Sequence, residues 1–266
     1  MTNRRELIVA LGASALTLAI PTVALAQANA STEIAPTGKL RVGMHAANAN
    51  LVTRAADGSV SGLAVDLGKF LAAKLGVPFE PVVYPSNARF IESFGKGDWD
   101  TTIAGRNPFA ETLLDFMPVV IQVEYVFVAA PGLGIADAGE VDRTGIRIGV
   151  AGNATGDVVL SRMLKSAALV RVPGDVAAAV DLLRTGKADM FATSTEVALI
   201  VAERLPGAKI LAGTFTTVDF AVAMPKGRPA AAQEKITQLV NEAKAAGVVQ
   251  KAIETSNLKG VRVAPN

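Results

Sequence analysis

The chain of 266 residues contains no cysteine and a single histidine, His45. The lack of cysteine excludes disulfides, thiolate metal ligands, a cysteine nucleophile and a lipid-modified cysteine. One imidazole excludes a metal site built from several histidines, and it would have to be the base of any Ser-His-Asp arrangement. We therefore expect no bound metal and no other cofactor.

Net charge is also small. Lys and Arg number 26 against 24 Asp and Glu, which gives a formal net charge of +2. This balance gives no electrostatic reason to expect a nucleic-acid or an anionic-membrane partner. Apolar residues make up 50% of the chain and charged residues 19%, which is typical of a globular protein. The length suits one large domain or two small ones.

The N-terminus has the features of a secretion signal. Arg4-Arg5 precedes an apolar stretch over residues 7–20, and Ala24-Leu25-Ala26 is a small-residue cleavage pattern. Pro21 interrupts the apolar stretch, which is short for a transmembrane anchor. The sequence predicts a cleaved signal peptide over residues 1–26 and a monomeric protein free in the periplasm. The cleavage site and the export route, Sec or twin-arginine, stay open.

Downstream of a polar linker over residues 27–37, strand and helix patterns alternate. Strand patterns at residues 40–44 and 79–84 flank a helical apolar face at residues 65–75, and Asn87 is expected to cap a short helix. The same alternation restarts in the second half of the chain. Two βαβαβ units predict an α/β fold with two mainly parallel sheets and flanking helices.

Two β-like runs, residues 119–129 and 220–224, are candidate crossovers between these units. They predict two lobes joined by two hinge crossovers. Lobe 1 would contain residues 38–129 and 218–266, and lobe 2 would contain residues 130–217. Two hinged lobes enclose a cleft that can close on a ligand.

A Gly-x-x-Asp pattern recurs, from Gly97 to Asp100 in the first half and from Gly186 to Asp189 in the second. Each copy follows a helical pattern and precedes a strand, so it indicates an internal repeat. The alternative is that such a pattern ends helices in any α/β protein.

Several motifs, taken in order, resemble a known family. They are Lys39-Leu40-Arg41-Val42-Gly43, Asp57-Gly58 with Asp66-Leu67, Ile103-Ala104-Gly105 with Asp115-Phe116, Gly149-Val150-x-Gly152, and Leu183-x-x-Gly186-Lys187-x-Asp189. Over residues 38 to about 253 the chain resembles the periplasmic solute-binding proteins of ABC importers, family 3, in the polar amino acid-binding branch. The resemblance implies a type II periplasmic binding protein fold, a small polar ligand, and docking on an ABC permease and ATPase complex in the inner membrane.

Two positions depart from the family pattern. Ala110 stands where the resemblance implies an arginine that clamps the ligand's α-carboxylate, and Ser194 stands where it implies an aspartate that takes the α-ammonium. Arg106 falls close to the missing arginine. Three ligands stay open: an amino acid in an altered pose, a carboxylate, or an uncharged polar solute.

Candidate ligand contacts follow the ends of the predicted strands, where open α/β sheets bind ligands. In lobe 1 they are His45, Asn48, Tyr84, Gly105, Arg106 and Asn107. In lobe 2 they are Asn153, Ala154, Thr155, Ser194 and Thr195, with Asp219 at the second crossover. Arg106 would contact an anionic ligand group, or else brace the surface. For His45 the alternative is a hydrogen-bonded loop residue, and Trp99 is expected to be structural.

The rival hypothesis is an enzyme. The same fold includes cyclohexadienyl dehydratases, and such an enzyme needs a general acid in the cleft. Glu196 and Asp219 are the available carboxylates, and no convincing motif surrounds either. We therefore expect a binding protein and not an enzyme, while a sensor that feeds a chemoreceptor or a kinase stays open.

Overall fold

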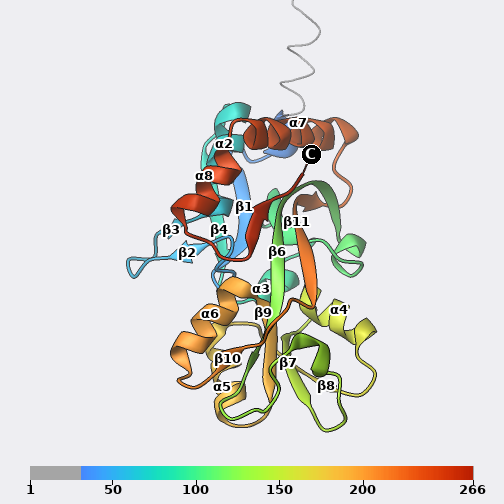
Figure 1. Cartoon of the computed structure of the whole chain (residues 1–266). Helices are drawn as coiled ribbons and strands as arrows, with labels where there is room; N and C mark the ends of the chain where they lie inside the picture. Colours follow the sequence, from blue (N-terminus) through green and yellow to red (C-terminus); the bar gives the residue numbers. More distant parts are fainter. Residues whose placement is uncertain (1–30, 266) are drawn as a thin grey trace, which may run out of the picture.

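A computed structural model describes residues 31–265 of the chain. The molecule is elongated and has an upper and a lower part in the view of Figure 1. The predicted signal peptide, residues 1–26, lies outside the described residues. Within residues 31–265, no helix is both long and apolar enough to span a membrane.

The upper part is built on three parallel strands, with β1 between the other two. These are β1 (Leu40–His45), β4 (Phe79–Tyr84) and β5 (Thr101–Gly105). Its helices are α2 (Leu63–Leu75), α3 (Asn87–Glu92), α7 (Ala230–Ala245) and α8 (Val248–Thr255). Leu63, Leu67 and Leu71 recur at helical spacing on α2, so one face of the helix packs into the main core.

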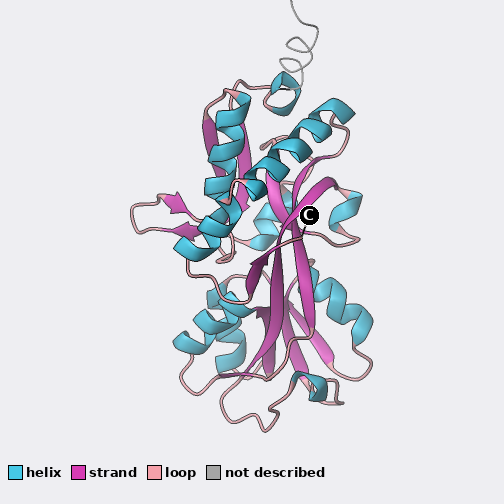
Figure 2. Cartoon of the chain, turned by 45° about the horizontal axis from the view of Figure 1, so that its top comes forward, coloured by secondary structure: helices cyan, strands magenta, loops and turns pink. Residues whose placement is uncertain are grey.

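The lower part repeats this arrangement. Its parallel strands are β7 (Arg147–Ala151), β8 (Ala168–Val172) and β9 (Met190–Ser194), with β7 in the middle. Its helices are α4 (Thr155–Met163), α5 (Val176–Arg184) and α6 (Thr195–Arg204). Figure 2 shows helices on both sides of the strands in this part. Two further clusters of buried apolar residues form its core.

Two long antiparallel strands, β6 (Leu114–Ala129) and β11 (Thr216–Pro225), connect the parts. β11 pairs with β5 and β6, while the last five residues of β6 pair with β9. The two predicted parallel sets are therefore joined in one hydrogen-bonded sheet, in the order β4-β1-β5-β11-β6-β9-β7-β8. Both predicted crossover runs are longer than expected, because this antiparallel pairing extends them.

Short elements complete the chain. They are the hairpin β2 (Thr53–Arg54) and β3 (Val60–Ser61), the strands β10 (Lys209–Ile210) and β12 (Val261–Val263), and the 3₁₀ turns η1 (Ala110–Thr112) and η2 (Ala138–Glu140). The expected linker is partly wrong, because residues 31–34 are helical and Ile34 is fully buried in the main core. One apolar side chain thus anchors the segment that precedes β1.

The two Gly-x-x-Asp copies make the same contacts. Asp100 accepts hydrogen bonds from the backbone N–H of Arg41 (3.0 Å) and from its guanidinium (2.8 and 3.1 Å). Asp189 accepts the same set from Arg147, at 2.7, 2.7 and 3.2 Å. In the upper part the Asp100 carboxylate joins the start of β1 to the start of β5. In the lower part the Asp189 carboxylate joins the start of β7 to the start of β9. The sequence repeat is therefore also a repeat of structure.

Candidate functional site

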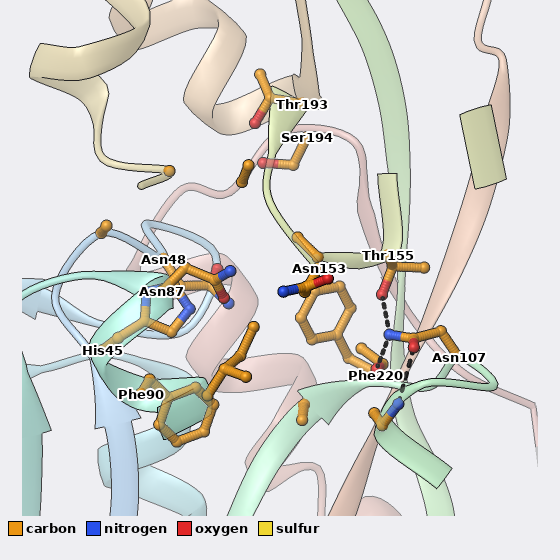
Figure 3. A pocket seen from close by; sticks show the side chains of 18 of the residues that line it. His45, Asn48, Asn87, Phe90, Asn107, Asn153, Thr155, Thr193, Ser194 and Phe220 are labelled. Atoms are coloured by element: carbon orange, nitrogen blue, oxygen red, sulfur yellow. Dashed lines mark hydrogen bonds between the residues drawn. The ribbon is translucent and has the colours of Figure 1, made fainter. Parts of the chain in front are cut away.

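A cavity of about 100 Å³ lies between the upper and lower parts. Eight of the predicted contacts line it: His45, Asn48, Gly105, Asn107, Asn153, Ala154, Thr155 and Ser194. β1, β5 and β9 end at His45, Gly105 and Ser194, and the loop after β7 brings in Asn153. Because parallel strands of one set end at the same edge, both parts present their strand ends to this cavity (Figure 3).

Arg106 and Tyr84 do not line the cavity. The Arg106 side chain is 49% exposed, and its Nε lies 2.7 Å from a carboxylate oxygen of Glu111. Successive side chains of an extended chain point to opposite sides, so Asn107 turns inward and Arg106 outward. The Tyr84 hydroxyl donates to the Asp98 carboxylate at 3.2 Å. Neither side chain is therefore placed to contact a ligand in this cavity.

Thr195 and Asp219 also lie outside the cavity lining. The Thr195 hydroxyl donates to the backbone carbonyl of Glu124 on β6 at 3.2 Å. Asp219 on β11 accepts from the side-chain amide of Gln122 at 2.9 Å. Both residues therefore hold the connecting strands in place.

The cavity lining is neutral. Among residues 31–265, no Asp, Glu, Lys or Arg lines it. Its polar side chains include five asparagines and three hydroxyl residues: Asn48, Asn50, Asn87, Asn107, Asn153, Thr155, Thr193 and Ser194. Its aromatic walls include Phe90, Phe94, Phe109, Phe191 and Phe220. No group of His, Cys, Asp and Glu that could hold a metal ion occurs in the described residues.

Hydrogen bonds cross the cavity from the upper to the lower part. Three asparagine side chains donate them: Asn50 to the Ser194 hydroxyl (2.8 Å), Asn107 to the Thr155 hydroxyl (3.1 Å) and Asn87 to the Gly152 carbonyl (3.4 Å). The Asn107 bond is drawn in Figure 3. The two parts are thus in contact, and the arrangement is closed.

Two buried polar atoms at the cavity have no hydrogen-bond partner in the described part of the chain. They are Nδ1 of His45 and Oδ1 of Asn50. Since buried polar groups are almost always paired, these atoms are open to groups of a bound molecule. The hydrogen-bonded loop role considered for His45 therefore does not hold for its Nδ1.

Burial lowers the pKa of His45 from its usual 6.5 to about 4. The unfolded chain then binds more protons than the folded one between these values. The contribution of His45 to the free energy of unfolding should be fully present above pH 6.5. It should fall by up to about 3 kcal/mol as the pH drops to 4. Urea unfolding of the wild type and of His45→Gln across this range tests it. The variant should lose less on acidification, and equal losses would contradict the prediction.

Sequence reasoning missed several lining residues. Asn87 was expected to cap α3, but the cap is Ser86, whose hydroxyl accepts from the N–H of Arg89, and Asn87 lines the cavity. Asn50 lies two residues beyond Asn48, so its loop was already identified. The phenylalanines carry no such signal, because an apolar residue in a buried strand or helix has the same pattern whether it packs in a core or lines a cavity.

Comparison with known proteins identifies the class. Two parts that share a sheet through two long strands form the type II periplasmic binding protein fold, which solved structures also show. A mutant of ArgBP from T. maritima is 22% identical with a TM-score of 0.72, and the match covers 86% of this chain and 99% of that one. The solute receptor for L-cysteine of Neisseria gonorrhoeae is 20% identical with a TM-score of 0.75, covering 88% and 99%.

A third similar structure is the ancestral amino acid-binding protein AncCDT-1, described as a precursor of cyclohexadienyl dehydratase. It is 22% identical with a TM-score of 0.71, and the match covers 85% of this chain and 98% of that one. A search of curated proteins found no match. The family described as bacterial extracellular solute-binding proteins, family 3, matches residues 40–255. The chain belongs to this family.

Proposed function

We propose that the protein is the periplasmic substrate-binding component of an ABC transporter. It captures a small polar solute between two lobes and delivers it to a permease and ATPase complex in the inner membrane. The observation that carries the proposal is the neutral cavity, which both parts line and three asparagines bridge. Closure on a solute requires contacts that only the closed form makes, and side chains from both sides supply them.

We further propose the lobe boundaries predicted above, residues 38–129 and 218–266 against residues 130–217. Separate apolar clusters support a division into two lobes, because two lie in the upper part and two in the lower part. The end of β6, residues 126–129, packs in the lower clusters. The connecting strands β6 and β11 then act as the hinge. Ligand contacts come from His45, Asn48, Gly105 and Asn107 on one side and from Asn153, Ala154, Thr155 and Ser194 on the other.

Binding fits the cavity better than catalysis. The two carboxylates considered for a dehydratase, Glu196 and Asp219, do not line it. Glu196 accepts from the backbone N–H of Lys259, in the C-terminal segment, at 3.0 Å. A general acid must reach the substrate through a hydrogen bond, and neither side chain is placed to do so.

Thermal melting of the protein without residues 1–26 tests the binding function. A ligand at about a hundred times its dissociation constant adds about 2.7 kcal/mol of stability, which raises the melting temperature. The panel contains amino acids, organic acids, sulfonates, amides and polyols. A rise with at least one class is expected. No rise with any class would contradict the proposed function.

Trp99 provides an independent signal of binding, since it is the only tryptophan. It is almost fully buried, and its ring centroid lies 6.1 Å from that of Phe90, which lines the cavity. We expect any ligand that raises the melting temperature to change the emission of Trp99 as well. Arg106→Ala should keep the response unchanged. A stabilising ligand that leaves the emission of the wild type unaltered would contradict contact at Phe90.

A further inference from the structure

We propose that the bound solute is uncharged and carries amide or hydroxyl groups on one edge and an apolar face on the other. This inference rests on the proposed binding function and names the class of its ligand. A ligand of this class would distinguish this chain from proteins that bind a zwitterion between two side chains of opposite charge. Four features of the cavity support the inference.

The first feature is that, in the described part of the chain, no charged side chain lines the cavity to compensate a ligand charge. Ala110 lines the cavity with a methyl group, and Ser194 offers a neutral hydroxyl that already accepts from Asn50 at 2.8 Å. The nearby cation of Arg106 is turned to the surface and paired with Glu111. A buried ionised group without a partner loses its hydration and gains too little in return. Within the described residues, a zwitterion would find no side chain of opposite charge at either end.

The second feature is an unpartnered acceptor. Asn50 is 2% exposed, and its Nδ2 donates to both Ser194 and Asn48, but its Oδ1 accepts no hydrogen bond among residues 31–265. This oxygen is open to an N–H or O–H group of the ligand. Carboxylates and sulfate carry acceptors alone, so an oxyanion would leave it unpaired. The ligand therefore needs a donor.

The third feature is a mixed set of amides and one imidazole. Figure 3 shows Asn48, Asn87 and His45 gathered on one side of the cavity, with Asn153 on the other. Asn153 has a φ of 59°, the left-handed conformation that asparagine tolerates better than most residues. Side-chain amides offer donors and acceptors at once, and this matches amide, urea or hydroxyl groups of a ligand.

The fourth feature is the apolar wall. Phe90 and Phe220 are both at most 5% exposed and line the cavity, and Phe109 adds a third ring. Aromatic faces favour an apolar or planar surface on the ligand. The polar edge and this wall together fix the orientation of the solute.

Calorimetry with matched compounds tests the inference. Butyramide, methylurea, 2-pyrrolidone and 1,2-butanediol form the uncharged arm, butyrate and sulfate the anionic arm, and alanine, glutamine and arginine the zwitterionic arm. We expect binding in the uncharged arm alone, with affinity changing less than about twofold between low salt and 0.5 M NaCl. Binding of an α-amino acid or an anion in preference would overturn the inference and leave the proposed function intact. No binding in any arm would count against both.

Variants at Asn50 sharpen the test. Asn50→Leu keeps similar volume and removes both the acceptor and the donor to Ser194, so affinity for the best uncharged probe should fall at least tenfold. Ser194→Ala removes the bridge between these two residues but keeps the acceptor, and it should cost less. Arg106→Ala is the control and should change the affinity less than twofold. Equal affinity in Asn50→Leu and wild type would overturn the role of this oxygen. Circular dichroism and melting of each variant exclude unfolding as the cause of a loss.

Discussion

Replacing Gly105 with alanine should lower ligand affinity at least tenfold while the free protein stays folded. A Cβ at this position would lie 2.5 Å from the hydroxyl oxygen of Thr155 on the opposite side of the cavity. Real Cβ atoms essentially never come that close. Thr155 is held by the side chain of Asn107 at 3.1 Å, so it turns away only by losing that bond. Otherwise the two proposed lobes must separate, which weakens the closed form. Each tenfold loss of ligand affinity corresponds to about 1.4 kcal/mol.

Isothermal titration of wild type, Gly105→Ala, Thr155→Ala and the double variant measures this effect. The second substitution removes the oxygen that the new methyl group meets, so the double variant should bind no worse than Thr155→Ala alone. Such non-additivity is the mark of two groups in contact. Additive losses would show that Gly105 acts through something other than this close approach.

A matched glycine inside the lower core provides the control. A Cβ on Gly149 would overlap with the side chains of Leu182 and Phe191, both of which are buried in that core. No lobe movement relieves this overlap, so Gly149→Ala should lower the melting temperature of the free protein. Overpacking of this kind costs about 1–3 kcal/mol. The two alanine variants should therefore separate loss of closure from loss of folding.

Replacing Asp100 with alanine should be the most destabilising polar change in the described chain. The carboxylate is fully buried, and its removal leaves the guanidinium groups of Arg41 and Arg228 without their partner. Breaking a buried ion pair on one side costs about 3–5 kcal/mol, a large share of the stability of a typical domain. Urea unfolding near neutral pH measures the loss.

The equivalent change in the lower part is the matched control. Asp189 has one arginine partner, Arg147, and their side chains are 22% and 43% exposed. The Arg147 guanidinium and backbone N–H lower the pKa of the Asp189 carboxyl. Because water screens this pair, Asp189→Ala should cost about 1 kcal/mol or less. Equal losses at Asp100 and Asp189 would contradict the view that burial sets the difference.

Much of the fold could be predicted from local patterns. The strand at residues 79–84 has the bounds that the sequence predicts, and the strand predicted at residues 40–44 and the helix predicted at residues 65–75 differ by one or two residues. The helix signal ends at Gly76 and the strand signal of residues 79–84 at Pro85. The shared sheet could not be predicted in this way, because the pairing of β6 with β11 and β9 joins segments far apart in sequence. Such pairing is a tertiary effect that no short window of residues contains.

Some of the predicted ligand contacts line the cavity and others do not, and the difference again depends on what local patterns contain. Most of those at a strand end or in the loop after it, such as Asn107 and Asn153, lie at the cavity, because the position of a strand end fixes the edge of the sheet, but Tyr84 at the end of β4 does not. Arg106 was singled out because it follows Gly105 at a strand end and carries a guanidinium, and neither feature tells which way the side chain points. Its orientation depends on one residue of register at the end of β5, and Glu111 holds it at the surface.

The place of β6 in the sequence predicts which of the two parts folds first. The buried residues of the two lower clusters come from one continuous stretch, residues 126–211. The main upper cluster combines residues 34–123 with residues 218–253, so it is incomplete until the C-terminal segment arrives. Contacts of long sequence separation carry a larger loop-closure cost and form more slowly. The lower part should therefore fold first, as a nucleus against which the two ends of the chain come together.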